Sequence, residues 1–265
     1  MQTLTKTSLL SLNTLAEVIA IAQHAGAILR EMFDTNLDVW EKNPGDFLTD
    51  ADMAAHHYIV SDLRRRFPGT HVWSEEGQRP ASGTSPLWVV DPLDGTANYA
   101  HRFPNIAVSI ALYSEGQYVL GVVHDPLRGH TFAALRGHGA TLNGRPIHVS
   151  DEQRLQRAFV ACDWARGEPR KRLMRVIQDV GMEVHAIRSL GAAALGMAYV
   201  AVGWLEGYFN VNLQPWDFGA GVVIVEEAGG YVTNWRGGPL GLEASDVLCA
   251  NPHLHPLLLH RTFDV

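Results

Sequence analysis

The chain of 265 residues has few cysteines and no excess of basic residues. Its two cysteines, Cys162 and Cys249, each lie in an apolar stretch, which is typical of buried free thiols rather than of a disulfide framework. There are 21 Lys and Arg against 28 Asp and Glu, and the densest basic stretches, 64–66 and 170–172, are short and lie in helix-like segments. This composition argues against a nucleic-acid-binding protein.

Several other features are missing. No stretch approaches ~18 consecutive apolar residues, and the N-terminal residues show no apolar segment followed by a cleavage site. The 13 histidines form no His-x-x-x-His pair with a nearby third ligand, which argues against a zinc site. The chain has no internal repeat and no low-complexity linker. We therefore expect a cytoplasmic protein that does not bind a membrane.

The hydrophobic pattern of the first half predicts helices followed by strands. Apolar residues recur at helical spacing over residues 12–33, which predicts a long first helix. Thr49 is a suitable N-cap for a second helix that ends near Phe67. Residues 106–149 contain strand-like segments separated by turns, and Asn143-Gly144 is a strong hairpin signal. We expect an antiparallel meander there.

The pattern changes at about residue 150. From residue 151 onward, strand-like segments alternate with helix-like ones. Helices, then a meander, then alternating strands and helices predict an α+β or layered α/β fold in which two sheets pack among helices. We expect two lobes, an N-terminal α+β lobe of residues 1–150 and a C-terminal α/β lobe of residues 151–265.

The most informative motif follows a short apolar run, Leu87–Val90, which leads directly to Asp91. Pro92 is expected to end the strand there, because it lacks an N–H group. Asp94 comes next, beside Gly95, which lets the backbone approach a ligand closely. Carboxylates at the edge of an apolar core are costly unless they are paired or bind a metal. The motif therefore predicts a hard-cation site next to a bound phosphate.

Two further carboxylates belong with this motif. Glu75 follows a strand-like run, and Asp217 stands at the start of an apolar helix. Each one alone is explained more simply as a helix cap or a surface residue. Together with Asp91, Asp94 and the Leu93 carbonyl, they predict an all-oxygen site for Mg²⁺.

The predicted chemistry is phosphate monoester hydrolysis by a metal-activated water, without a covalent intermediate. Asp91 is placed to bridge two ions, and Glu75 to hold the ion that carries the water and to help take its proton. The Thr96 hydroxyl is placed to orient that water. If a helix starts here, the N–H groups of Gly95, Thr96 and Ala97 can bind the phosphate.

These motifs resemble the signature regions of the inositol monophosphatase family, within the lithium-sensitive, magnesium-dependent phosphatase superfamily. The resemblance rests on Trp-Ser-Glu-Glu at 73–76, Trp-Val-Val-Asp-Pro-Leu-Asp-Gly-Thr-Ala-Asn-Tyr at 88–99 and Pro-Trp-Asp-Phe-Gly-Ala-Gly at 215–221, and it extends over nearly the whole chain. It implies a five-layer α-β-α-β-α sandwich with an antiparallel N-terminal sheet and a mixed C-terminal sheet. It also implies a homodimer and two to three Mg²⁺ ions.

The resemblance also implies which residues form the site. The metal ligands would be Glu75, Asp91, the Leu93 carbonyl, Asp94 and Asp217. The catalytic residues would be Glu75, Thr96 and Asp52, the last of which supports the threonine. The substrate would contact Glu75, Leu93, Asp94, Gly95, Thr96, Gly191, Ala192, Ala193, Asn210 and Asp217.

Three departures from the family pattern concern the substrate. Inositol-specific members carry a glutamate where this chain has Asn210, and animal members carry a histidine where it has Gln214. Glu75 lies only sixteen positions before Asp91, which predicts a shorter loop and a more open mouth. The expected substrate is inositol monophosphate or a related polyol or sugar phosphate.

Alternatives remain open. The same chemistry could act on fructose 1,6-bisphosphate, histidinol phosphate or a 3′-phosphoadenosine nucleotide, although the sequence shows no clear mark of a nucleotide pocket. A further alternative is a partner-binding scaffold that keeps the fold. Loss of a metal ligand would favour that hypothesis, and all the expected ligands are present.

Overall fold

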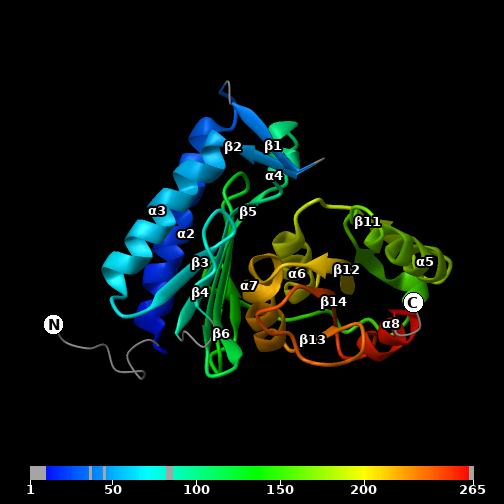
Figure 1. The fold of residues 1–265 in the computed structure, drawn as a ribbon. Helices are drawn as coiled ribbons and strands as arrows, with labels where there is room; N and C mark the ends of the chain where they lie inside the picture. The colour runs from blue at the N-terminus through cyan, green and yellow to red at the C-terminus, as the bar shows by residue number, and fades with distance from the viewer. Residues whose placement is uncertain (1–9, 36–37, 44–45, 82–85, 263–265) are drawn as a thin grey trace.

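The computed structural model describes residues 10–35, 38–43, 46–81 and 86–262. They form five layers (Figure 1). Helices α2 (Leu12–Met32) and α3 (Asp50–Arg66) cover one face of a seven-stranded sheet. Helices α6 (Ala193–Ala201) and α7 (Pro215–Glu227) fill the space between its other face and a five-stranded sheet. Helices α5 (Pro169–Gly181) and α8 (His255–Thr262) cover the outer face of that second sheet.

This is the expected layered fold, and local sequence signals explain much of its first layer. Ser11 caps α2 by accepting a hydrogen bond from the Thr14 N–H at 3.1 Å. Thr49 caps α3 as expected, in a capping box completed by Asp52. Among the described helices, α2 alone is long and apolar enough to cross a membrane. Its apolar side, which includes Val18 and Leu29, is buried in the core against the sheet, as in a core helix of a globular domain.

The seven-stranded sheet follows the order β3-β4-β5-β6-β7-β8-β9. Every pair from β4 to β9 is antiparallel, as the meander predicts, and the edge strand β3 runs parallel to β4. Asn143 and Gly144 form the expected hairpin turn, both with positive φ. The strands are β3 (His71–Ser74), β4 (Leu87–Asp94), β5 (Ala107–Ser114), β6 (Gln117–Asp125), β7 (His130–Leu135), β8 (Ala140–Leu142) and β9 (Arg145–Ile147).

The expectation that Pro92 ends its strand is wrong. Strand β4 continues to Asp94, and its register with β5 shifts between Asp91 and Asp94. Two residues of β4, Pro92 and Leu93, therefore stand opposite a single residue of β5, which is a β-bulge. A bulge accommodates proline because it releases a residue from the hydrogen-bonded ladder, and it also redirects the side chains on both sides.

The five-stranded sheet has the order β11-β10-β12-β14-β13 and is mixed, as expected. Strand β10 pairs in parallel with β11 and β12, and the remaining pairs are antiparallel. Its strands are β10 (Phe159–Ala161), β11 (Ala186–Arg188), β12 (Gly207–Leu213), β13 (Tyr231–Asn234) and β14 (Ser245–Ala250). A small hairpin of β1 (Val39–Asn43) and β2 (Asp46–Thr49), the short helix α4 (Thr96–Ala100) and a single 3₁₀ turn, Leu155–Arg157, complete the described elements.

Candidate active site

A cavity of about 610 Å³ opens where strand β4 ends. Its wall combines the end of β4 with α4, the segment that leads into α6, the end of β12 and the start of α7. Eleven of the residues that the sequence nominates line it: Glu75, Asp91, Leu93, Asp94, Gly95, Thr96, Ala97, Gly191, Ala193, Asn210 and Asp217. Two nominated residues do not: Asp52 lies behind Thr96, and Ala192 is buried at 1% exposure.

Each of three carboxylates is held by backbone N–H groups. Asp91 Oδ1 accepts from the Leu93 N–H at 3.0 Å across the bulge. Asp217 Oδ2 accepts from the Gln214 N–H at 2.7 Å, within the capping box of α7. Asp94 accepts from the Ala193 and Ala194 N–H groups at 3.1 and 2.8 Å, at the beginning of α6. These bonds fix the directions of the side chains before any ligand binds.

The carboxylates repel one another electrostatically. Burial raises the pKa of Asp91 well above its ordinary value, and the charges of Glu75, Asp94 and Asp217 raise it further. Burial and then the Asp217 charge raise the pKa of Asp94 in the same way. Burial and the Glu75 charge raise the pKa of Asp217 to about 7. A cation in this pocket would relieve the repulsion and favour the ionised forms.

The donor set fits a hard cation. It consists of carboxylate oxygens and the Leu93 carbonyl, and none of the described lining residues offers a thiolate or an imidazole. Within the described residues, no group of three or more His, Cys, Asp or Glu side chains is arranged as it stands to hold a metal ion. Mg²⁺ sites use one or two carboxylates and keep several waters, so an open group of carboxylates suits Mg²⁺ better than a closed cage does.

Thr96 links the pocket to the first helical layer. Its hydroxyl lies 3.0 Å from both Asp52 Oδ1 and the Leu93 carbonyl oxygen, and it can donate to either. Asp52 Oδ2 accepts from the Thr49 backbone N–H at 2.8 Å and from the Thr49 hydroxyl. Burial raises the pKa of Asp52 to about 6, against the opposing effect of these hydrogen bonds.

Two glycines are required by the backbone around the pocket. Gly95 has a φ of +90°, and a Cβ there would lie 2.8 Å from the Asn105 carbonyl oxygen. Gly191 has a φ of +69°, and a Cβ there would lie 2.8 Å from the amide of Asn98. That amide holds the loop in place by donating to the Leu190 and Asn105 carbonyls, each at 2.8 Å. Only glycine avoids both the strain and the clash at these two positions.

Asn210 is more constrained than the sequence suggests. Its Oδ1 accepts from the Val211 N–H at 2.9 Å, and its Nδ2 donates to the Tyr208 hydroxyl at 3.2 Å. Tyr208 in turn donates to Asp163 Oδ2 at 2.9 Å. The amide thus belongs to a buried network at the floor of the pocket.

Asp163 is a site residue that the sequence analysis missed. It lines the pocket, is 8% exposed, and accepts hydrogen bonds from the Leu190 and Gly191 N–H groups. Together with Asn98, it fixes the loop that carries Gly191 from two sides. Its position two residues after the end of strand β10 was the available signal, because ligands bind beyond the carboxyl ends of parallel strands.

The outer wall was missed too. Phe47, Trp164 and Arg166 line the mouth of the pocket, and Trp164 is 56% exposed. They come from the β1–β2 hairpin and from the segment after β10, so no local pattern connects them. They add aromatic surface and a positively charged side chain to the lining of the pocket.

The five-layer sandwich is the fold of a class of phosphatases, and in this chain carboxylates gather beside the turn at Gly95. The model of the inositol monophosphatase family matches residues 11–264, so the chain belongs to that family. Similar proteins include the Nus factor SuhB of Escherichia coli K12, 34% identical over 93% of this chain and 94% of the relative. An inositol-1-monophosphatase of Mesorhizobium japonicum is 36% identical over 91% of this chain and 93% of the relative.

The solved structures agree with this membership. The extragenic suppressor protein suhB of Bartonella henselae is 34% identical and superposes with a TM-score of 0.91 over 95% of this chain and 99% of its own. The fold, including its layer order, is therefore shared with this family.

Proposed function

We propose that the protein is a Mg²⁺-dependent phosphomonoesterase that hydrolyses inositol monophosphate or a related polyol or sugar phosphate. One observation carries this proposal: Glu75, Asp91, Asp94 and Asp217, from distant parts of the chain, line one pocket. Such a group of buried acids is costly without cations. Membership in the inositol monophosphatase family and the name of the Mesorhizobium japonicum relative support the same chemistry.

In this proposal the metal ligands are Glu75, Asp91, the Leu93 carbonyl, Asp94 and Asp217, for two to three Mg²⁺ ions. Bound Mg²⁺ would lower the pKa of a water molecule and offset the negative charge of the phosphate. These residues lie just after β3, at the β4 bulge and at the start of α7, and their meeting in one pocket supports the proposal.

Thr96, Asp52 and Glu75 prepare the attacking water. When Asp52 accepts the hydroxyl hydrogen of Thr96, the Thr96 oxygen is left to accept a hydrogen bond from the water. Glu75, on the same pocket wall, takes the proton as the water attacks phosphorus. The bond between phosphorus and the alcohol oxygen breaks, the departing alkoxide takes a proton from a solvent water, and Glu75 returns its proton to solvent, so no covalent intermediate forms.

The substrate lies between two walls. Gly95 and Thr96 contact the phosphate where the backbone comes close, and Gly191 and Ala193 line the side of the alcohol. Ala192 supports Gly95 from behind: its methyl group lies 3.4 Å from the point that a Gly95 Cβ would occupy. Asn210 forms part of the pocket floor. Its amide has fewer hydrogen-bonding positions left for ring hydroxyls than a free carboxylate would have, because it already bonds to Val211 and Tyr208.

A second candidate substrate class is favoured by the outer wall. Trp164 and Arg166 at the mouth suit a phosphomonoester with a flat ring or a second negative charge. That description covers the 3′-phosphoadenosine nucleotide, histidinol phosphate and fructose 1,6-bisphosphate alternatives. The chemistry at the carboxylates stays the same.

The proposal extends to the location, the oligomeric state and the partners of the protein. We propose a cytoplasmic homodimer that does not bind nucleic acid or a membrane, with lobes of residues 1–150 and 151–265. The relative named Nus factor raises the alternative of a partner-binding scaffold. The complete set of proposed ligands in one pocket favours catalysis over that alternative.

A phosphate-release screen tests the proposal. The purified protein is assayed with Mg²⁺ against inositol 1-phosphate, glycerol phosphate, histidinol phosphate, fructose 1,6-bisphosphate and 3′-phosphoadenosine nucleotides. We expect release that EDTA abolishes. Absence of release from every compound would favour the scaffold.

A further inference from the structure

A second cavity, of about 600 Å³, lies between helix α3 and the edge strand β3. It shares no lining residue with the carboxylate pocket. Its size is within the range of small-molecule sites. Its polar lining residues are His56, His57, Ser61 and Arg64 from α3, and Ser74 and Gln78 from β3 and the turn that follows it.

The lining of this cavity has a positive character. Among the described residues that line it, none is Asp or Glu, and the polar ones are an arginine, two imidazoles, two hydroxyls and an amide. The charges of His57 and Arg64 both act to lower the pKa of His56, although burial is the larger cause, and Glu76 outside the lining opposes them. The imidazoles, hydroxyls and amide can all donate hydrogen bonds to an anion, as arginine does.

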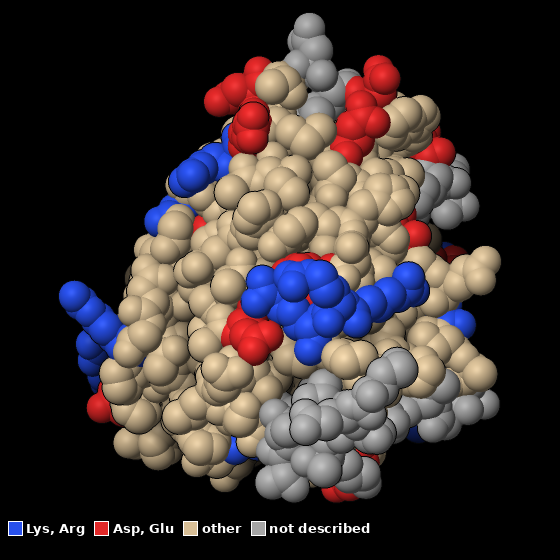
Figure 2. Space-filling model, turned by 90° about the vertical axis from the view of Figure 1, so that its left-hand side faces the viewer, with Lys and Arg blue, Asp and Glu red and all other residues tan. Residues whose placement is uncertain are grey.

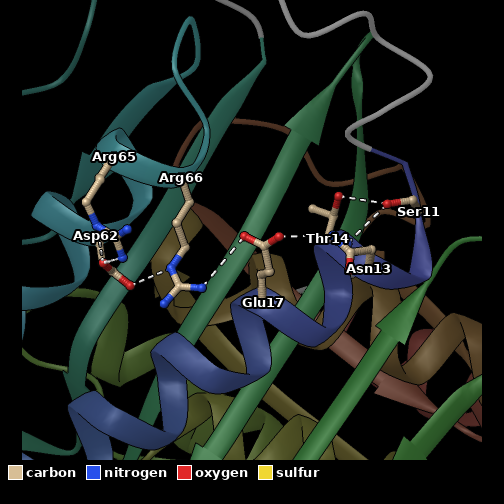
Figure 3. A network of polar contacts seen from close by, with 7 residues as sticks. All are labelled: Ser11, Asn13, Thr14, Glu17, Asp62, Arg65 and Arg66. Atoms are coloured by element: carbon tan, nitrogen blue, oxygen red, sulfur yellow. Dashed lines mark hydrogen bonds and ion pairs between the residues drawn. The ribbon is translucent and has the colours of Figure 1, made fainter.

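Arg64 differs from the two arginines that follow it. Arg65 and Arg66 both pair with Asp62, and Arg66 also lies 3.8 Å from a Glu17 oxygen (Figure 3). Arg64 forms no ion pair with any residue that the structure describes, and its side chain lines the cavity. On this side of the molecule, Lys and Arg side chains lie in several places, and the largest group, at the centre, adjoins Asp or Glu side chains (Figure 2).

One wall of the cavity is the turn that carries Glu75. His56 Nδ1 lies 2.8 Å from the Ser74 hydroxyl, next to Glu75 in the chain. The Gly77 N–H donates to the Ser74 carbonyl at 2.9 Å and closes this turn against the His56 ring. Glu75 itself is joined to β4 by its N–H, which donates to the Val90 carbonyl at 3.0 Å. A ligand that contacts His56 and Gln78 would therefore also contact or shift the turn that positions Glu75.

We propose that this cavity binds the phosphate group of a small anion and that its occupancy adjusts the Glu75 turn. Arg64 and the imidazoles contact the phosphate, and Gln78 and Ser61 contact the remainder of the molecule. The volume exceeds what a bare phosphate fills, so a phosphorylated metabolite of sugar-phosphate size is the better fit than inorganic phosphate. The effect on catalysis rests on the proposed function, whereas the binding does not.

Binding is measured first by calorimetry on the full chain in EDTA, with ribose 5-phosphate and inorganic phosphate as separate probes. Without metal, the carboxylate pocket repels both anions. We expect one site per chain, tighter for ribose 5-phosphate. Arg64→Ala should weaken it about tenfold, the usual effect of losing one charge-assisted hydrogen bond.

The matched control is Arg65→Ala, on the same helical turn but paired with Asp62. It should bind both probes as the wild type does. Arg64→Glu adds a second test, because a reversed charge should abolish binding while this exposed position leaves the fold intact. Equal binding by all three variants, or no binding by the wild type, would overturn the proposal. Equal affinity for ribose 5-phosphate and inorganic phosphate would show that the sugar adds nothing to binding, and the ligand would then be free phosphate.

The regulatory effect is tested with Mg²⁺ by adding inorganic phosphate to the assay. Phosphate in the catalytic pocket competes with substrate and raises KM in every variant. Phosphate in the second cavity should change kcat in the wild type and in Arg65→Ala but not in Arg64→Ala. An unchanged kcat in the wild type would overturn the regulatory effect. Binding is scored in EDTA, so a failure of the proposed catalytic activity would be recognised separately.

Discussion

The Thr96 hydroxyl lies 3.0 Å from Asp52 Oδ1, and the other oxygen of that carboxylate caps helix α3. One side chain thus joins the first turn of α3 to the pocket at the end of β4. A polar network of this kind is rigid when every member is satisfied. Asp52 therefore holds Thr96 in a fixed orientation although it does not line the pocket itself.

We predict that Asp52→Asn lowers kcat by on the order of 10²-fold, because a slightly misplaced hydroxyl no longer aligns the water. The helix cap is weakened as well, at about 1 kcal/mol of unfolding free energy. Steady-state kinetics and urea unfolding measure the two effects. Asp50→Asn is the control, since Asp50 is an exposed acid in the same turn. A normal kcat in Asp52→Asn would remove Asp52 from the mechanism.

Asp94→Asn is predicted to reduce turnover nearly to background, because the pocket loses a ligand charge. The same change leaves one N–H group at the start of α6 facing an amide instead of a carboxylate oxygen, which costs about 1–3 kcal/mol of unfolding free energy. Calorimetric Mg²⁺ titration separates the loss of metal from the loss of stability. Asp179→Asn, an exposed acid on α5, controls for net charge. Full activity in Asp94→Asn would contradict the assignment.

Gly191→Ala should raise KM, because its methyl group would press on Asn98 and shift the loop that lines the alcohol. Gly137→Ala is the matched control: Gly137 also has positive φ, but nothing lies within 4 Å of the point that a Cβ would occupy there. Both variants bear a strain of about 1–2 kcal/mol. Thermal unfolding temperatures should therefore fall in both, whereas KM changes only in Gly191→Ala. A normal KM there would show that the loop does not contact substrate.

The contribution of His124 to the stability of the protein should fall as the pH drops below about 6.5, whereas the raised pKa values of Asp52 and Asp217 act in the opposite direction. Burial lowers the pKa of His124, outweighing the opposing effect of the Asp125 charge. The folded state therefore binds fewer protons than the unfolded state, and His124 stabilises the fold above its unfolded pKa and loses this effect as the pH falls toward its folded pKa.

Urea unfolding at about pH 7.5 and about pH 5.5 measures this dependence. Between these pH values, the unfolding free energy of the wild type should fall relative to that of His124→Gln. His138→Gln, at an exposed position, should follow the wild type. An identical pH dependence in all three proteins would exclude His124 as a source.

Local signals predicted much of the fold. The Thr49 cap and the Asn143-Gly144 turn form as expected, because each depends on residues adjacent in the chain. The strand through Pro92 could not be foreseen, since the bulge that accommodates proline exists only in register with β5.

For the candidate site too, the sequence predicted what depends on neighbouring residues and not what depends on tertiary contacts. The motif at 91–96 nominated residues that the fold brings together with Glu75 and Asp217, and their roles stay predictions. The sequence did not identify Asp163 and Trp164 as pocket residues. They reach the pocket only because the folded chain brings them close to segments that are distant in the sequence. The internal partners of Asn210 were equally invisible, since they lie on the floor of the folded pocket.

The central claim is that the gathered carboxylates hold Mg²⁺ for phosphate hydrolysis. The most direct measurement is phosphate release from inositol 1-phosphate by the wild type and by Asp217→Asn, each with Mg²⁺ and with EDTA. We predict release by the wild type with Mg²⁺ alone, and background rates in the other three conditions. Release that persists in EDTA, or in Asp217→Asn at the wild-type rate, would contradict the account.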